Sequence, residues 1–167
     1  MTNDTNEWKH FTRRIYIDAD PAELYSAWAS SDGLKKWFLQ NASYFSPDGS
    51  EKPGSSPAEK GDSYEWSWFG FDLVSKGRIE EANGKDHLKF TFGTDEEVVS
   101  VDIKENNGRT LVELQQSHLH SEAEDRKRVY MGCIIGWTYH LANLKSVYEG
   151  GIDLREHNPD VDNLVNS

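Results

Sequence analysis

Aromatic side chains recur at alternate positions in predicted strands, a pattern that could form the wall of a ligand cavity. Trp66 and Trp68 stand two residues apart, and so do Phe90 and Phe92, so each pair faces one side of its strand. Ligand cavities are mostly apolar concavities with a few polar groups. The alternative is that the rings simply fill the core, because aromatic side chains are efficient core fillers. The aromatic residues expected to line the cavity are Trp66, Trp68, Phe90, Phe92, Tyr130 and Trp137.

Two polar residues share a strand face with Val112 and Leu114, so Gln116 and His118 are expected to point inward near the cavity mouth. Inward polar groups need partners, which are either a ligand or neighbouring side chains and water. His118 could act as an acid–base group in a cyclase-like or dehydratase-like reaction, because its ordinary pKa is near neutral. The spacing places no second catalytic group beside it, so we assign no catalytic residue.

Other reactive residues give weaker signals. Cys133 lies in an apolar helical stripe, where a cysteine usually serves as a small hydrophobe, and no adjacent base is identified. His118 and His120 stand two apart, but no third ligand follows at a defined spacing, so we predict no metal site and no cofactor. The acidic run 95–97 lies at a predicted turn and is interpreted as solvated charge.

The elements that must position these residues are predicted from periodicity and turn signals. A strand over 11–18 precedes a helix capped by Asp20 with Pro21 in its first turn, and a second short helix holds Leu34, Trp37 and Phe38. The stretch 47–61 is rich in Ser, Gly, Pro and charge and predicts an exposed, mobile loop. One hypothesis places this loop near the cavity mouth. Short strands then follow on tight turns, which indicates an antiparallel meander: 63–69, 72–80, 88–92, 97–104 and 110–118.

A helix of about seven turns is predicted over 121–149, with a capping box at its start and Gly150-Gly151 at its end. Its apolar stripe is wide enough to lie along the concave face of the sheet. Gly132 and Gly136 fall off that stripe, and each costs about 1 kcal/mol relative to Ala. We therefore expect close packing against this flank, by the chain's own loop or by a second subunit.

Composition limits the classes of partner. The 167 residues fit one domain, expected over 9–151, with a flexible tail over 1–8 and a polar C-terminal tail over 152–167. The formal net charge of −11 disfavours binding to nucleic acid or anionic membrane. A single cysteine and the absence of a signal sequence or an apolar membrane span predict a cytoplasmic protein.

Two stretches carry a resemblance to a known family. The opening IDADPAELYSAWASSDGLKKWF and the closing GWTYHLANLKSVYEGG resemble the activator of heat-shock-protein-90 ATPase homologues, within the START-like SRPBCC superfamily. The resemblance implies an α+β helix-grip (Bet v 1-like) fold. In that fold a curved antiparallel sheet wraps around a long C-terminal helix, with two short helices after the first strand and a cavity between sheet and helix. It implies no reaction, because the superfamily includes ligand carriers, cyclases and co-chaperone domains.

The sequence therefore predicts a non-enzymatic binding domain, a monomer or homodimer. It would hold a small apolar or aromatic ligand or assist a chaperone in a stress response. The alternatives are a small cyclase- or dehydratase-like enzyme acting on an aromatic or polyketide-like substrate, and a module whose acidic face docks on a basic protein partner.

Overall fold

The computed structural model describes residues 8–117, 123–158 and 160–165. Its seven strands form one antiparallel sheet in the order β1-β7-β6-β5-β4-β3-β2. The strands are β1 His10–Ile17, β2 Asn41–Phe45, β3 Ser63–Ser67, β4 Val74–Ala82, β5 His87–Phe92, β6 Thr94–Asn106 and β7 Arg109–Ser117. The helices are α1 Pro21–Ala29, α2 Ser31–Lys35 and α3 Ala123–Tyr148.

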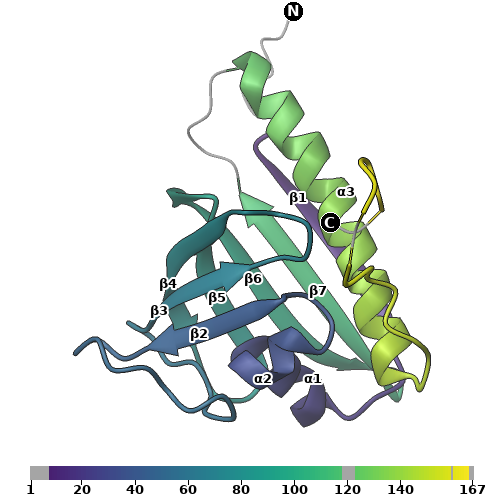
Figure 1. Cartoon of the computed structure of the whole chain (residues 1–167). Helices are drawn as coiled ribbons and strands as arrows, with labels where there is room; N and C mark the ends of the chain where they lie inside the picture. Colours follow the sequence, from purple (N-terminus) through teal and green to yellow (C-terminus); the bar gives the residue numbers. More distant parts are fainter. Residues whose placement is uncertain (1–7, 118–122, 159, 166–167) are drawn as a thin grey trace, which may run out of the picture.

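The sheet is strongly curved, and the helices lie on its concave side (Figure 1). The short helices α1 and α2 cover one end of the curve, while α3 runs diagonally beside β1, against which it packs. This arrangement is the helix-grip fold predicted from the sequence, with the two short helices after the first strand.

The helix ends follow from local chemistry. The Asp20 side chain accepts a hydrogen bond from the Ala22 N–H at 2.8 Å, and Pro21 begins α1, as predicted. At the end of α3, Gly150 adopts a φ of +79°, which a residue with a Cβ rarely tolerates. The N–H of Gly151 then donates to the Ser146 carbonyl at 2.7 Å, which satisfies one of the last free carbonyls of the helix.

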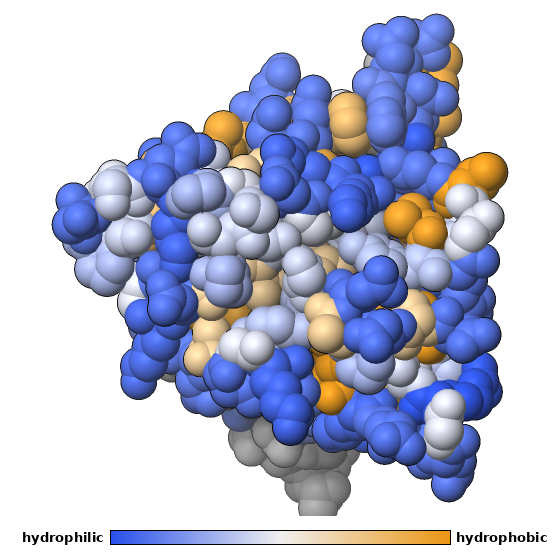
Figure 2. Space-filling model, turned by 90° about the horizontal axis from the view of Figure 1, so that it is seen from below, coloured by the Kyte–Doolittle hydropathy of each residue, from blue (hydrophilic) through white to orange (hydrophobic). Residues whose placement is uncertain are grey.

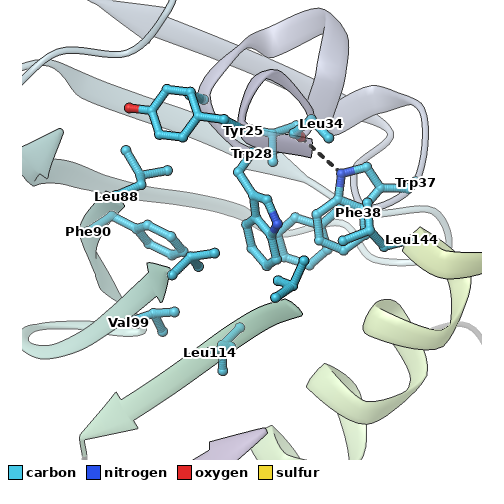
Figure 3. Close-up of a cluster of buried hydrophobic side chains, with 14 of the residues drawn as sticks. Tyr25, Trp28, Leu34, Trp37, Phe38, Leu88, Phe90, Val99, Leu114 and Leu144 are labelled. Carbon is cyan, nitrogen blue, oxygen red and sulfur yellow. Dashed lines mark hydrogen bonds between the residues drawn. The ribbon is translucent and has the colours of Figure 1, made fainter. Parts of the chain in front are cut away.

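The core lies between the sheet and the helices, and a group of aromatic rings is at its centre (Figure 3). The rings of Trp28 and Trp37 lie edge to face with centroids 4.6 Å apart, and Trp37 Nε1 donates to the Ala27 carbonyl at 2.9 Å. This bond fixes the start of the α2–β2 connection against α1. Phe38 stacks on Trp37 at 5.2 Å and continues toward α3.

Several predicted boundaries were wrong. The strand β2 was not predicted at all, and α2 ends at Lys35, so Trp37 and Phe38 follow the helix instead of lying in it. The strand predicted from residue 72 begins only at Val74, and β6 begins at Thr94. These differences matter for function, because residues 68–73 become an irregular connection beside α3.

The loop predicted over 47–61 has little regular structure but is attached to the domain. Ala58 is buried, and its N–H donates to the Ala29 carbonyl at 2.6 Å. Lys52 lies 2.8 Å from the carboxylates of both Glu59 and Asp62. The segment is therefore more firmly held than an exposed loop.

The surface seen from below Figure 1 is mainly hydrophilic, and its apolar residues form small separate patches (Figure 2). Among the described residues, no helix has the length and apolar character needed to cross a bilayer.

Candidate ligand-binding cavity

A mainly apolar cavity of about 280 Å³ lies between the middle of α3, the end of β5 and the β3–β4 connection. It is lined by Phe38, Trp68, Phe71, Leu73, Phe92, Gly132, Cys133, Gly136, Trp137 and His140. Phe71 and Leu73 are 51% and 66% exposed, so these two side chains lie at the solvent end of the cavity. The volume is close to the lower end of the range for small-molecule sites.

The aromatic wall is continuous across three elements. The Trp137 ring on α3 lies 5.2 Å from Phe92 and 5.1 Å from Phe38, measured between centroids. Phe38 also meets Trp68 edge to face at 5.6 Å. Because each ring contacts rings of another element, the wall is held by packing on both the sheet and the helix.

The sequence-predicted cavity residues divide into two groups. Trp68, Phe92 and Trp137 line the cavity. Trp66 and Phe90 are fully buried in the core, and Trp66 stacks on Tyr64 with centroids 3.8 Å apart. Their alternation with Trp68 and Phe92 was read correctly, but they lie deeper in the curve of the sheet.

The remaining predicted residues lie beside the cavity or outside the described part of the chain. Tyr130 packs edge to face on Phe11 at 5.3 Å, away from the lining residues. Gln116 points inward and is fully buried. His118 and His120 fall outside the described residues, and within that part no group of three His, Cys, Asp or Glu could hold a metal ion.

Gln116 holds the cavity wall in place. Its Oε1 accepts a hydrogen bond from Trp137 Nε1 at 2.7 Å, and its Nε2 lies 3.6 Å from Cys133 Sγ. The amide therefore fixes two lining residues from behind. Burial, and to a smaller extent the nearby Glu97 carboxylate, raise the pKa of the Cys133 thiol to about 11, so the thiol is neutral. Glu97 is itself buried, so the prediction of solvated charge was wrong at this position.

Gly132 and Gly136 form part of the helical side of the cavity. A Cβ built on Gly132 would meet nothing within 4 Å. The close packing expected against this flank is therefore not present at Gly132. The absence of a side chain there leaves open space.

His140 is a cavity residue that the sequence analysis missed. The side chain is buried, its ring meets Phe38 edge to face at 4.8 Å, and its Nδ1 has no hydrogen-bond partner. Burial, and to a smaller extent the positive charge of Arg155, lower the pKa of His140 to about 3, so the imidazole is neutral at physiological pH. One signal could have found it, since Gly132, Gly136 and His140 recur every four residues and share a helix face.

The C-terminal segment lies behind His140. Arg155 is buried, donates to the Leu39 and Lys35 carbonyls at 3.0 and 2.9 Å, and pairs with Asp153 at 2.7 Å. Asn143 on α3 donates to the Trp37 carbonyl at 2.7 Å and to Asp153 at 3.0 Å. The segment predicted to be a polar tail thus ties α3 to the α2–β2 connection through residues 153–155.

The curved sheet, the long helix and the cavity between them define a helix-grip domain of the START-like SRPBCC type. Residues 18–149 match the family described as activator of Hsp90 ATPase homolog 1-like protein, and the chain belongs to this family. The match includes both stretches that carried the resemblance in the sequence, apart from their outermost residues.

Solved structures share the fold at low sequence identity. The Aha1 dimer from Colwellia psychrerythraea is 19% identical with a TM-score of 0.62, covering 85% of this chain and 97% of that one. A protein from Staphylococcus saprophyticus is 18% identical with a TM-score of 0.69, covering 87% and 96%. DynU16, from the dynemicin biosynthetic locus, is 15% identical with a TM-score of 0.66, covering 90% of this chain and 51% of that one. A search of curated proteins gave no match.

Proposed function

We propose that this chain is a non-enzymatic binding domain that holds a small apolar or aromatic ligand in the cavity between α3, the end of β5 and the β3–β4 connection. Five Phe and Trp side chains in its lining offer stacking and edge-to-face contacts to a flat ligand. Burying such a ligand contributes roughly 25 cal/mol for each Å² of apolar surface removed from water.

The proposal rests mainly on one observation, a glycine at position 132 in the middle of α3 that lines the cavity. A glycine in the middle of a helix is destabilising by about 1 kcal/mol relative to alanine. No neighbour requires it, because a Cβ at this position would meet nothing within 4 Å. A destabilising residue that packing does not require is typical of a functional site. The space that this glycine leaves belongs to the cavity.

Filling the cavity from the helix tests the proposal. We expect Gly132→Leu to abolish binding of naphthalene, used as an apolar probe, in equilibrium dialysis, while thermal melting shows a fold at least as stable. Ala142→Leu is the matched control, since Ala142 is an exposed α3 residue that does not line the cavity. Equal retention of naphthalene by wild type and Gly132→Leu would refute the proposal.

Native mass spectrometry of freshly purified protein extends this test to the natural ligand. An additional mass that leaves on denaturation, present in wild type and absent from Gly132→Leu, would give the mass of the occupant. The same spectrum reports whether the protein is a monomer or a homodimer, as the solved Colwellia relative is.

The enzymatic alternative has less support from the cavity. A general acid or base works best with a pKa near the operating pH, whereas His140 has a pKa of about 3 and Cys133 a pKa of about 11. The chaperone alternative is supported by the family description alone, which names an activator of the Hsp90 ATPase. We favour ligand binding because the cavity that supports it lies within this chain.

A further inference from the structure

We propose that the ligand of this cavity is an uncharged aromatic molecule that carries one hydroxyl-like group, and that the His140 imidazole binds that group. This inference rests on the proposed function and adds the chemical class of the ligand. It is carried by the position of one neutral polar side chain in an otherwise apolar lining.

His140 is the unusual member of the lining. Only 4% of the residue is exposed, and its Nδ1 is buried without a hydrogen-bond partner. Nearly all buried polar groups in proteins are hydrogen-bonded, so an unpaired one calls for a reason. The ring sits against Phe38 and lines the cavity, so a ligand there contacts the ring, and a rotation of the side chain would bring the buried Nδ1 to a polar group of the ligand.

The other lining residues are less suited to hydrogen-bond a hydroxyl group of the ligand. The indole N–H of Trp137 already donates to Gln116 at 2.7 Å. The neutral thiol of Cys133 is a weak donor and a weak acceptor, and Trp68 can only donate. His140 alone among the lining side chains offers a strong acceptor nitrogen as well as a donor. A hydroxyl group can pair with either ring nitrogen, because it both donates and accepts.

The surroundings disfavour a charged ligand, and an anion most of all. None of the described residues that line the cavity carries a formal charge. The guanidinium of Arg155 pairs with Asp153 and donates to the carbonyls of Lys35 and Leu39. The carboxylate that acts on Cys133 is Glu97, which would repel an anion. A buried charge without a partner is strongly unfavourable, so a carboxylate ligand is disfavoured.

The size of the cavity indicates one or two rings. Its volume of about 280 Å³ lies just below the usual range for drug-sized ligands. Naphthalene, 2-naphthol and 2-naphthoate therefore form a suitable series of probes, since they share one ring system and differ only in the polar group.

The test is a double-mutant-type cycle, in which the hydroxyl group is removed from the ligand and the imidazole is removed from the protein. Dissociation constants of the three probes are measured by equilibrium dialysis on wild type, His140→Leu and Trp68→Phe. In wild type, the ratio of the naphthalene constant to the 2-naphthol constant should exceed that in His140→Leu by roughly tenfold, the size of one hydrogen bond. Trp68→Phe, which removes the other free N–H donor of the wall, should leave the ratio unchanged. In wild type, 2-naphthoate should bind more weakly than 2-naphthol.

The outcomes separate this inference from the proposed function. If naphthalene and 2-naphthol bind equally well to wild type and to Gly132→Leu, the cavity is not the site and both proposals fail. If both probes bind in the cavity with the same ratio in wild type and His140→Leu, only the role of His140 is overturned. A ratio that falls in Trp68→Phe instead, or tighter binding of 2-naphthoate, overturns it as well. Should His140→Leu not fold, His140→Phe takes its place in the cycle.

Discussion

Two histidines of this domain show how their surroundings set opposite protonation states. His87 is partly buried, which lowers its pKa, but hydrogen bonds to Asp102 at 2.8 Å and Glu81 at 3.1 Å outweigh burial and raise the pKa overall. His140 lacks such a partner, and burial keeps its pKa at about 3. The stability due to His87 is present at low pH and is lost as pH rises through its raised pKa. The stability due to His140 is instead present at neutral pH and is lost as pH falls below the ordinary histidine pKa.

At the residue scale, we expect His140 to make the domain sensitive to mild acid. Between pH 7 and pH 5 the unfolded chain binds a proton at this residue while the folded chain does not, so wild type loses stability as pH falls. Relative to His140→Leu, the loss should be about 1–2 kcal/mol over this interval. Urea unfolding of both proteins at the two pH values measures it. The contribution of His87 cancels in the comparison, and parallel pH profiles would contradict the assignment.

At the element scale, the sequence predicted the long helix and most strands because their periodicity is regular. In β3, Tyr64 and Trp66 alternate with less buried residues as expected. The strand β2 was missed because Asn41–Phe45 is only five residues long and follows the apolar run 37–39, which hides its alternation. In the irregular connection, Leu73 was predicted to lie at the start of a strand over 72–80, whereas Phe71 fell in the predicted turn before it.

The cavity was predictable only in part, because only its residues in regular strands and helices follow a period in the sequence. Alternation placed Trp68 and Phe92 toward the helix, and the apolar stripe placed Trp137. Phe71 and Leu73 lie in irregular backbone, which no period describes. How deep Trp66 and Phe90 lie depends on the curvature of the sheet, which is a property of the whole fold.

The C-terminal segment behaves as a structural element although it has no helix or strand. We expect Arg155→Met to destabilise the domain by about 2–3 kcal/mol, because it leaves the Leu39 and Lys35 carbonyls and the partly buried Asp153 carboxylate without this partner. Urea unfolding measures the cost, and hydrogen exchange should show faster exchange around 36–39 in the variant. Ile152→Ser is the control, since Ile152 is exposed, and should change stability by less than about 0.5 kcal/mol. An unchanged midpoint in Arg155→Met would show that the segment is not fixed by this residue.

At the scale of the whole molecule, family and fold were within reach of the sequence, whereas the occupant of the cavity was not. The opening and closing stretches carry enough of the family pattern to identify it, and the match over 18–149 agrees. The fold alone hosts many functions, so the ligand has to be argued from the lining of this particular cavity.

The net charge of −11 also acts on the molecule as a whole. Repulsion among excess acidic groups opposes the compact state, and salt weakens this repulsion. We therefore expect the melting temperature to rise by about 2–5 °C between 10 and 200 mM NaCl, as stability increases by roughly 1 kcal/mol. A variant carrying Asp72→Lys and Glu105→Lys, two exposed positions, removes two units of negative charge at each and should show a smaller rise.

If melting temperature instead falls with salt in wild type, the surface ion pairs stabilise the domain more than its net charge destabilises it. The acidic surface would then be balanced locally, which would argue against its serving as a docking face for a basic partner.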